Sequence, residues 1–369
     1  MKVMTVVGTR PEIIRLSRTI ALLDASVEHV LIHTGQNAHG QLKDIFFSEM
    51  GIRTPDYYMG ADVSSEGQFL AEAFLGVERI LDKVQPDAFL ILGDTNSSLT
   101  AILAKKRRIP VYHLEAGNRS FDPNVPEESN RRIVDHLADF NFPYSEQARR
   151  NLAAEGLPAR RIVLSGSPLP EVLDFYSSQI GDSNVVERLG LESGNFFVVS
   201  AHRQENVDSE DRLRSLLAVL EAIGAEHQIP ILVSTHPRTA QRLNALEGGH
   251  TLPGVIFHEP FGFFDYVRLQ ASAKCVMSDS GTVSEEASIV GFPAVTLRSA
   301  IERPEAMEAG VLTLSDLSPS RTLRSIDFAV ANWRKMEVPW EYRTMNFSHR
   351  VVSTILSTAE SHKFWSGLR

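Results

Sequence analysis

The sequence contains a single cysteine, Cys275, among its 369 residues. One cysteine excludes an internal disulfide framework and any metal site built from several cysteines. Because Cys275 stands in an apolar run, we expect a small buried core residue and not a nucleophile.

Long hydrophobic runs and a signal peptide are also missing. No apolar stretch is long enough to span a bilayer. Residues 1–9 have the composition of a strand, and Arg10, Glu12 and Arg15 follow at once, unlike the apolar core of a secretory signal. We therefore expect a cytoplasmic protein that does not bind a membrane.

Positive charge is in the minority, and the formal net charge is −9. An acidic surface repels nucleic acid and anionic membranes, so neither is expected as a partner. This balance still allows local basic pockets that bind a phosphate group.

Short β-branched, apolar runs alternate with amphipathic helical segments along most of the chain. The strands that we expect are residues 2–7, 28–34, 88–93, 111–114, 140–144, 161–165, 196–200, 231–235, 255–259, 275–278, 294–297 and 311–314. Helical patterns lie between them, as at residues 77–84, 212–223 and 266–271. Hydrophobic strands that alternate with helices predict an α/β fold of parallel, doubly wound sheets with helices on both faces.

The length exceeds what one compact core usually holds, which favours two domains. The alternation pauses around residues 165–182, where proline and serine interrupt it. We predict a Rossmann-like domain over residues 1–170, a second over 171–347, and a cleft between them. Residues 348–369 are predicted to form a C-terminal helix that packs back on the first domain.

Polar motifs follow the expected strands, at the sheet edge where doubly wound folds bind ligands. The first is Gly8-Thr9-Arg10-Pro11-Glu12, a glycine turn that enters a helix. Backbone N–H groups of such a turn can bind an anion, and Arg10 can add a charged hydrogen bond to phosphate. A well-capped turn with a surface arginine explains this segment equally well.

Carboxylates follow the next strands of the first half. Asp94 comes after the strand at 88–93, Glu115 after 111–114, and Glu127 and Glu128 open a later helix. Asp94 alone is typical of a helix cap, and acids at a helix start can be structural. Several carboxylates at one cleft, however, suit proton removal and donation on opposite faces of a substrate.

The second half carries His202 after one strand and Asp279-Ser280-Gly281 after another. A Ser-Gly turn at a helix start is suited to a diphosphate. A carboxylate one turn into that helix can accept hydrogen bonds from both ribose hydroxyls.

Taken in order, these motifs resemble the non-hydrolysing UDP-N-acetylglucosamine 2-epimerases. The stretches that carry the resemblance are residues 8–12, 93–95, 115–117, 126–131, 202–203, 279–281, 285–286 and 302–305. The resemblance implies two Rossmann-like domains, as in one large class of glycosyltransferases (GT-B), and a homodimer. It implies a UDP-linked N-acetylhexosamine as substrate, and neither a metal nor another cofactor.

The implied reaction is elimination and re-addition. A base removes the C2 proton while UDP leaves C1, and the resulting glycal is protonated on its other face as UDP returns. By resemblance, Asp94, Glu115, Glu127 and His202 are catalytic. The residues implied to bind UDP are Arg10, His202, Tyr266, Ser280, Gly281 and Glu286.

Three departures from the common pattern indicate a sub-branch of the family. Residues 36–40 read Gln-Asn-Ala-His-Gly where an activator-binding motif is usual, Arg15 replaces a lysine, and the loop between Glu115 and Glu127 is shorter. Together with residues 118–122, 128–136 and 278–288, they resemble the enzymes that make UDP-N-acetyl-L-fucosamine for capsule or O-antigen. UDP-N-acetylglucosamine epimerisation, a hydrolysing epimerase, a GT-B glycosyltransferase and a nucleotide-sugar sensor remain alternatives.

Overall fold

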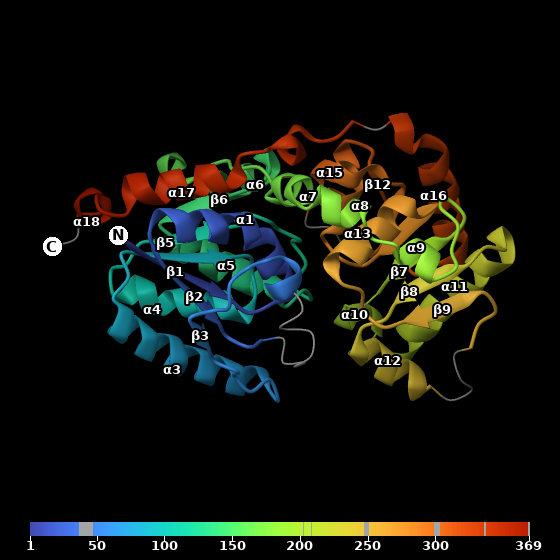
Figure 1. Cartoon of the computed structure of the whole chain (residues 1–369), viewed down its shortest axis with the longest axis horizontal. Helices are drawn as coiled ribbons and strands as arrows, with labels where there is room; N and C mark the ends of the chain where they lie inside the picture. The colour runs from blue at the N-terminus through green and yellow to red at the C-terminus, as the bar shows by residue number, and fades with distance from the viewer. Residues whose placement is uncertain are drawn as a thin grey trace. The chain divides into compact units, whose positions relative to one another are not determined.

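The computed structural model describes residues 1–36, 47–201, 203–207, 209–246, 251–298, 303–335 and 337–367. The chain divides into two compact units, drawn in Figure 1. Unit 1 comprises Met1–Val172 and Arg343–Arg369, and unit 2 comprises Leu173–Tyr342. In the described part, no helix is both long and apolar enough to cross a membrane.

The core of unit 1 is a six-stranded sheet in the order β3-β2-β1-β4-β5-β6. Every neighbouring pair is parallel. The strands are β1 (Lys2–Val7), β2 (Glu28–His33), β3 (Tyr57–Tyr58), β4 (Ala88–Leu92), β5 (Val111–Leu114) and β6 (Phe140–Phe142). This is the strand order of the Rossmann fold.

Helices cover both faces of this sheet. One face packs against α1 (Arg10–Ser26) and α17 (Phe347–Thr358), and the other against α3 (Glu66–Val84), α4 (Ala101–Lys106) and α5 (Glu127–Leu137). In α1, Ile13, Leu16, Ile20 and Leu23 recur at helical spacing and are all buried. Unit 1 also contains α6 (Glu146–Ala154), α7 (Leu169–Phe175), which ends in unit 2, and α18 (His362–Trp365).

Unit 2 repeats this architecture, with the strand order β12-β11-β10-β7-β8-β9. All neighbouring strands are again parallel. The strands are β7 (Phe197–Ser200), β8 (Ile231–Ser234), β9 (Val255–His258), β10 (Cys275–Ser278), β11 (Ala294–Leu297) and β12 (Leu312–Ser315). Numbered within the unit, this is the Rossmann order a second time, so the prediction of two doubly wound parallel sheets is confirmed.

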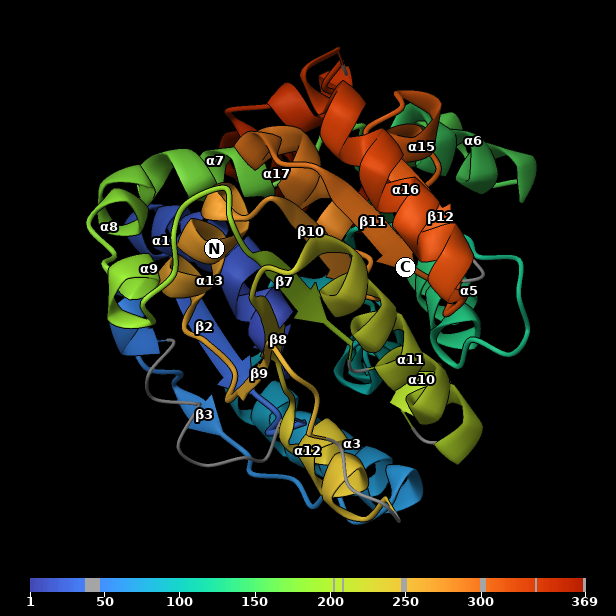
Figure 2. The same cartoon turned by 90° about the vertical axis from the view of Figure 1, so that its right-hand side faces the viewer.

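The helices of unit 2 also lie on both faces. One apolar core joins the sheet to α11 (Glu210–His227), α12 (Pro237–Asn244) and α16 (Pro319–Asn332), and Figure 2 shows α11 and α16 side by side. The other joins it to α9 (Val185–Arg188), α13 (Phe263–Ser272), α14 (Val283–Glu286) and α15 (Glu305–Glu308). The short helices α8 (Ser177–Gly181) and α10 (Gln204–Val207) complete the unit. Cys275 is fully buried, as expected, and burial raises the pKa of its thiol to about 12.

One strand prediction is wrong, and one strand was not predicted. Residues 161–165 form no strand and make only an isolated bridge, Asn141 with Ile162. Val163 and Ser165 donate to the carbonyls of Asn141 and Pro143, but Pro143 has no N–H to return a bond, so the ladder stops there. The two-residue strand β3 was not predicted, because two residues show no periodicity.

Candidate functional site

The strand order creates one switch point in each sheet, where successive connections turn in opposite directions and ligands bind in such folds. In unit 1 it lies between β1 and β4, and in unit 2 between β7 and β10. Arg10 and Asp94 belong to the two loops at the first switch point, whereas Ser280 and Gly281 belong to a loop at the second. The structure therefore puts these predicted residues at the ligand-binding edges of their own sheets.

Glu12 joins the two loops of the unit 1 switch point. Its Oε2 accepts hydrogen bonds from the backbone N–H groups of Gly8 (2.7 Å) and Thr9 (2.6 Å). Its Oε1 accepts one from Thr95 Oγ1 at 2.8 Å, in the loop after β4. The side chain is only 2% exposed, and this burial raises its pKa to about 7 in spite of the hydrogen bonds.

Gly8 is required by the close approach of the same loops. A Cβ atom at this position would lie 2.0 Å from Ser97 Oγ and 2.6 Å from Thr34 Oγ1. Ser97 also donates to Gln36 Oε1 from its backbone N–H and from its hydroxyl. The ends of β1, β2 and β4 are thus closely packed, and Arg10 begins α1, half-buried, directly beside them.

Asp94 contacts the N-terminal half of helix α5, which begins at Glu127. Arg131 Nε lies 2.6 Å from Asp94 Oδ2, and the Asn130 side-chain amide donates to the backbone carbonyl of Asp94 at 3.0 Å. Asn130 also donates to the Asn96 side chain, at 3.0 Å. Asp94 is therefore tied by hydrogen bonds to the first two turns of the helix that begins at Glu127.

The structure separates the roles of Glu127 and Glu128. Glu128 is buried and accepts hydrogen bonds from Ser120 N (3.0 Å) and Arg131 Nη1 (3.2 Å). Burial alone would raise the pKa of Glu128, but these hydrogen bonds hold it below its usual range. Glu127 is half-exposed, and its carboxylate makes no hydrogen bond or ion pair within the described residues. Glu128 is committed to the fold, whereas Glu127 is available for chemistry.

Glu115 follows β5 in an unusual backbone conformation, with φ at 66°, a region that side chains other than glycine rarely occupy. Such strain persists where the surroundings enforce it, and it clusters at functional sites. Arg15 of α1, itself buried, donates to Glu115 Oε2 at 3.0 Å and lies over the Tyr144 ring. The orientation of the Glu115 carboxylate is thus fixed by an ion pair from helix α1.

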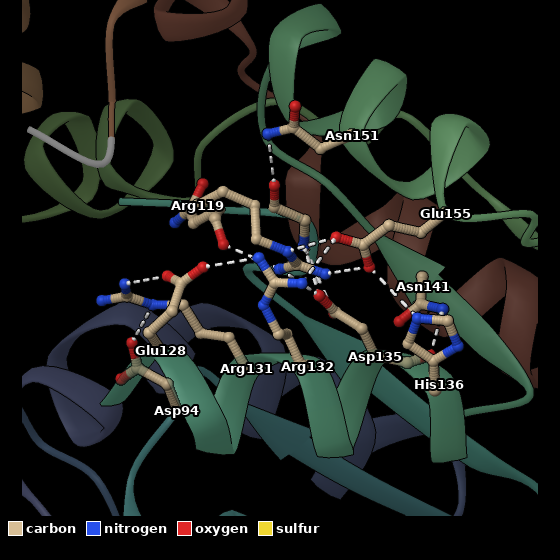
Figure 3. A network of polar contacts seen from close by, with 12 residues as sticks. Asp94, Arg119, Glu128, Arg131, Arg132, Asp135, His136, Asn141, Asn151 and Glu155 are labelled. Atoms are coloured by element: carbon tan, nitrogen blue, oxygen red, sulfur yellow. Dashed lines mark hydrogen bonds and ion pairs between the residues drawn. The ribbon is translucent and has the colours of Figure 1, made fainter. Parts of the chain in front are cut away.

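A buried charged network supports the turn that carries Glu115 (Figure 3). Asp135 of α5 is fully buried and accepts from Gly117 N at 3.2 Å and from Arg119 Nη1 at 2.7 Å. His113 Nδ1 lies 2.9 Å from the same carboxylate. Arg119 also bonds to both oxygens of Glu155, and these bonds lower the pKa of Glu155 to about 2.

Gly117 has no room for a side chain. Its φ is 82°, and a Cβ there would lie 2.3 Å from the backbone oxygen of Ala148. The turn between Glu115 and Arg119 is therefore fixed from two sides, by the Asp135 network and by the start of α6.

In unit 2, Asp279 joins two loops as Glu12 does in unit 1. Fully buried, it accepts from Arg203 N and from the Asn206 side chain, both at 3.0 Å. One carboxylate thereby joins the loop after β10 to the loop after β7.

The loop after Asp279 is held by internal hydrogen bonds and by Arg303. Ser280 N donates to Ser278 Oγ at 3.0 Å, and Ser280 Oγ lies 3.0 Å from Thr282 Oγ1. Arg303 donates to the carbonyl of Gly281 at 3.1 Å and pairs with the buried carboxylate of Glu285. These hydrogen bonds hold the loop at the sheet edge.

Glu286 and Tyr266 are linked through α13. The Gln270 side-chain amide donates to Glu286 Oε2 at 2.6 Å, and Tyr266 lies one helical turn before Gln270. Beyond Glu286 the helix continues as a π-helical turn, Ala287–Gly291, a type of distortion that is frequent at functional sites. The predicted ribose and uracil residues are therefore neighbours on one surface of unit 2.

Some predicted residues lie outside the described part of the chain. These are His202, Glu302 and residues 37–40 of the departing motif.

Sequence reasoning gave no role to Arg15, Asp135, Asp279 or Arg303. One signal was present for α5, where Glu128, Arg131 and Asp135 recur at spacings of three and four. This spacing puts three charges on one face of a helix. A charged stripe that the fold buries must be paired internally, which indicates a supporting network.

The raised pKa of Glu12 predicts a pH dependence of stability. Folded Glu12 holds its proton up to about pH 7, whereas the ordinary pKa of a glutamate is 4.5, so its contribution to stability falls as pH rises through that window. Glu12→Gln keeps an acceptor and a donor without the charge. Relative to wild type, we expect it to gain on the order of 3 kcal/mol between pH 4.5 and pH 8. Hydrogen exchange of the β1 amides, corrected for intrinsic rates, measures this difference.

The matched control is Glu66→Gln, at an exposed glutamate in the first turn of α3. Its difference from wild type should stay constant over the same pH range. Parallel curves for Glu12→Gln and wild type would show that Glu12 is ionised throughout.

Comparison with known proteins agrees with this geometry. A profile of the UDP-N-acetylglucosamine 2-epimerase family matches residues 21–356. The chain is 42% identical to a UDP-N-acetylglucosamine 2-epimerase from Rickettsia bellii, with a TM-score of 0.91 over 98% of both chains. It also resembles the Methanocaldococcus jannaschii enzyme solved with UDP-GlcNAc and UDP, with a TM-score of 0.91, 31% identity, and coverage of 97% of this chain and 100% of that one.

A relative with a different sugar specificity is also similar. The UDP-2,3-diacetamido-2,3-dideoxy-D-glucuronate 2-epimerase of Pseudomonas aeruginosa is 32% identical over 85% of this chain and 88% of its own length. The profile covers most of the sequence, and the strands, loops and carboxylates described above lie within it or just before it. The chain therefore belongs to the UDP-N-acetylglucosamine 2-epimerase family, which consists of isomerases.

Proposed function

We propose that this protein epimerises C2 of a UDP-linked 2-acetamido sugar by eliminating and re-adding UDP. The observation that carries the proposal is the set of carboxylates at the carboxyl edge of the unit 1 sheet. Arg15 orients the carboxylate of Glu115, and that of Glu127 makes no hydrogen bond or ion pair within the described residues. Removing a C2 proton requires a base, and returning it on the other face requires an acid, so more than one carboxylate is needed. In this account Asp94, Glu115 and Glu127 supply these groups.

The diphosphate is the leaving group, and negative charge develops on it as the C1–O bond breaks. N–H donors and cations already in place lower that barrier, because they need no reorganisation during the reaction. We assign this role to Arg10, His202 and the backbone at Ser280 and Gly281. The hydrogen bonds that hold this loop, with Arg303 donating to the carbonyl of Gly281, support the assignment.

The nucleoside is assigned to Glu286 and Tyr266. Gln270 holds one oxygen of Glu286, and the other is proposed to accept from the ribose hydroxyls. Tyr266 is proposed to lie near uracil, one turn along α13. Neither a metal nor a redox cofactor takes part in the proposed reaction.

The proposed sugar is the 6-deoxy-L-talo substrate, which gives UDP-N-acetyl-L-fucosamine for capsule or O-antigen. Its support is the sequence pattern around residues 118–136 and the Arg15–Glu115 ion pair, in which arginine stands where the common pattern has lysine. UDP-N-acetylglucosamine is the second candidate, favoured by the names of the relatives from Rickettsia bellii and Methanocaldococcus jannaschii.

The proposal includes a cytoplasmic homodimer. The edge strand β3 and helix α3 border a cavity of about 730 Å³ in unit 1. This cavity supports the proposal of a partner surface on unit 1. Tyr58 and Leu75 line the cavity and are 47% and 59% exposed. Exposed apolar side chains beside a strand edge are typical of association surfaces.

Solvent deuterium tests the reaction and the sugar together. Pure protein is incubated in deuterated water with UDP-N-acetyl-L-fucosamine and, separately, with UDP-N-acetylglucosamine, and C2 is followed by NMR. We expect exchange and epimerisation of the fuco sugar. Exchange in the gluco sugar alone would keep the mechanism and replace the substrate. UDP binding without exchange in either sugar would contradict an epimerase of these sugars and favour a glycosyltransferase, which leaves C2 untouched.

Neighbouring glutamates in α5 provide a matched pair of variants. Glu127→Gln should lower the C2 exchange rate by at least about 100-fold, the size expected for a lost acid or base, with little change in stability. Glu128→Gln should destabilise unit 1 by about 1–3 kcal/mol, because it weakens bonds to Ser120 and Arg131. Exchange rates and urea unfolding measure the two effects. Full activity of Glu127→Gln would remove Glu127 from the mechanism.

A further inference from the structure

A second polar cavity of unit 1 lies at the edge of the sheet opposite the catalytic residues. It has a volume of about 430 Å³ and is lined by residues just before β5 and β6 and by α18. Lys105 and Arg108 precede β5, and Asp139 immediately precedes β6. Because the strands are parallel, this is their amino-terminal edge, whereas Asp94 and Glu115 follow the carboxyl ends. The volume is within the usual range for small-molecule sites.

The lining is strongly basic in an otherwise acidic chain. Four cationic side chains line the cavity, Lys105, Arg108, Arg160 and Arg161, against the single carboxylate of Asp139. The local charge is therefore +3 with histidine neutral, in a protein of net charge −9. Asp139 is buried and already pairs with Lys105 at 2.7 Å and Arg161 at 3.0 Å. One carboxylate cannot neutralise the set, which leaves a strong preference for an anion.

Arg161 is held in place before any ligand arrives. Its guanidinium donates to Asp139 Oδ1 and to Ser366 Oγ, at 3.0 and 2.9 Å, and lies over the Phe140 ring. Arg160, its neighbour, is exposed and makes no hydrogen bond or ion pair within the described residues. A fixed guanidinium beside an uncommitted one suits a phosphate group, which accepts several charge-assisted hydrogen bonds.

An aromatic ring and a histidine form the wall contributed by α18. Trp365 lines the cavity and is 51% exposed. His362 is buried, and its Nε2 lies 3.6 Å from Asp139 Oδ1. Burial lowers the pKa of His362, so the ring is neutral near pH 7 and can donate to or accept from a polar ligand. An exposed indole beside cations offers a stacking surface for a flat ring.

From the cavity, its charge and the indole on its wall, we infer that this edge of unit 1 is a second binding site, which takes an organic phosphate with a flat ring, such as a nucleotide. The phosphate occupies the basic side between Arg160 and Arg161, and the ring stacks on Trp365. The site is separate from the proposed UDP site, because its residues lie on the amino-terminal edge of unit 1.

Isothermal titration on the full chain without UDP tests this site, because UDP is itself an organic phosphate with a flat ring and would compete for it. Variants of residues that line the cavity assign the binding to this site. The probes are adenosine 5′-monophosphate and inorganic phosphate. We expect both to bind, and Arg160→Glu to weaken both at least tenfold. Trp365→Ala should weaken the nucleotide about fivefold or more, as expected for a lost stacking contact, and leave inorganic phosphate unchanged.

The matched control is Lys106→Glu, which makes the same charge change at an exposed neighbour that does not line the cavity. It should weaken binding by less than about twofold. Equal effects of Arg160→Glu and Lys106→Glu would reduce the site to general electrostatics and overturn the proposal. Loss of the Trp365 effect would remove the ring from the ligand, and absence of binding by either probe would remove the site. UDP binding is measured in a separate titration. Its absence would contradict the proposed function and would leave the results for the cavity variants unchanged.

Discussion

In both units, loops that follow the strands are held by hydrogen bonds from backbone N–H groups and polar side chains to a buried carboxylate. Glu12 does this after β1 and β4, Asp279 after β7 and β10, and Asp135 at the turn after β5. The strand ends leave amide donors that are costly to bury unpaired, and a carboxylate accepts several of them at once. The conformation of each ligand-binding edge depends on this interaction.

This constraint also divides the acidic residues into two groups. Glu128 and Asp135 are buried and each accept both a backbone N–H and an arginine, so they serve to hold the fold. Glu115 and Glu127 differ: Glu115 has a strained backbone conformation and a carboxylate that Arg15 orients, and Glu127 makes no hydrogen bond or ion pair within the described residues. A site that exchanges protons needs both kinds, because the supporting carboxylates fix the geometry in which the reactive ones work.

Much of the fold follows from the sequence, because long β-branched runs and amphipathic helices have clear periods. The strands at 2–7, 275–278 and 294–297 were predicted to the residue. The edge strand β3 could not be predicted, because it has only two residues. The composition of residues 161–165 favours a strand, but Pro143 ends the ladder there. The positions of Arg10, Asp94, Ser280 and Gly281 at the sheet edges were also predictable from the strand ends.

The partners of the charged residues were not predictable, because they come from distant segments. Arg15 meets Glu115 across 100 residues, and Arg203 meets Asp279 across 76. Only the three-dimensional course of the chain decides which of two adjacent glutamates, 127 or 128, turns inward. The family resemblance gave the correct family, while the roles of individual carboxylates and the sugar remain proposals.

The most direct test of this account is the C2 exchange rate of Asp135→Asn, measured with a matched variant, Asp87→Asn. Asp87 accepts from the backbone N–H of Lys2 at the opposite edge of the same sheet. Circular dichroism and urea unfolding establish conditions under which both variants are folded. The account predicts that Asp135→Asn lowers exchange at least tenfold while UDP affinity is kept, and that Asp87→Asn leaves both unchanged. Wild-type exchange in folded Asp135→Asn would show that the buried network serves stability alone, and would contradict the account.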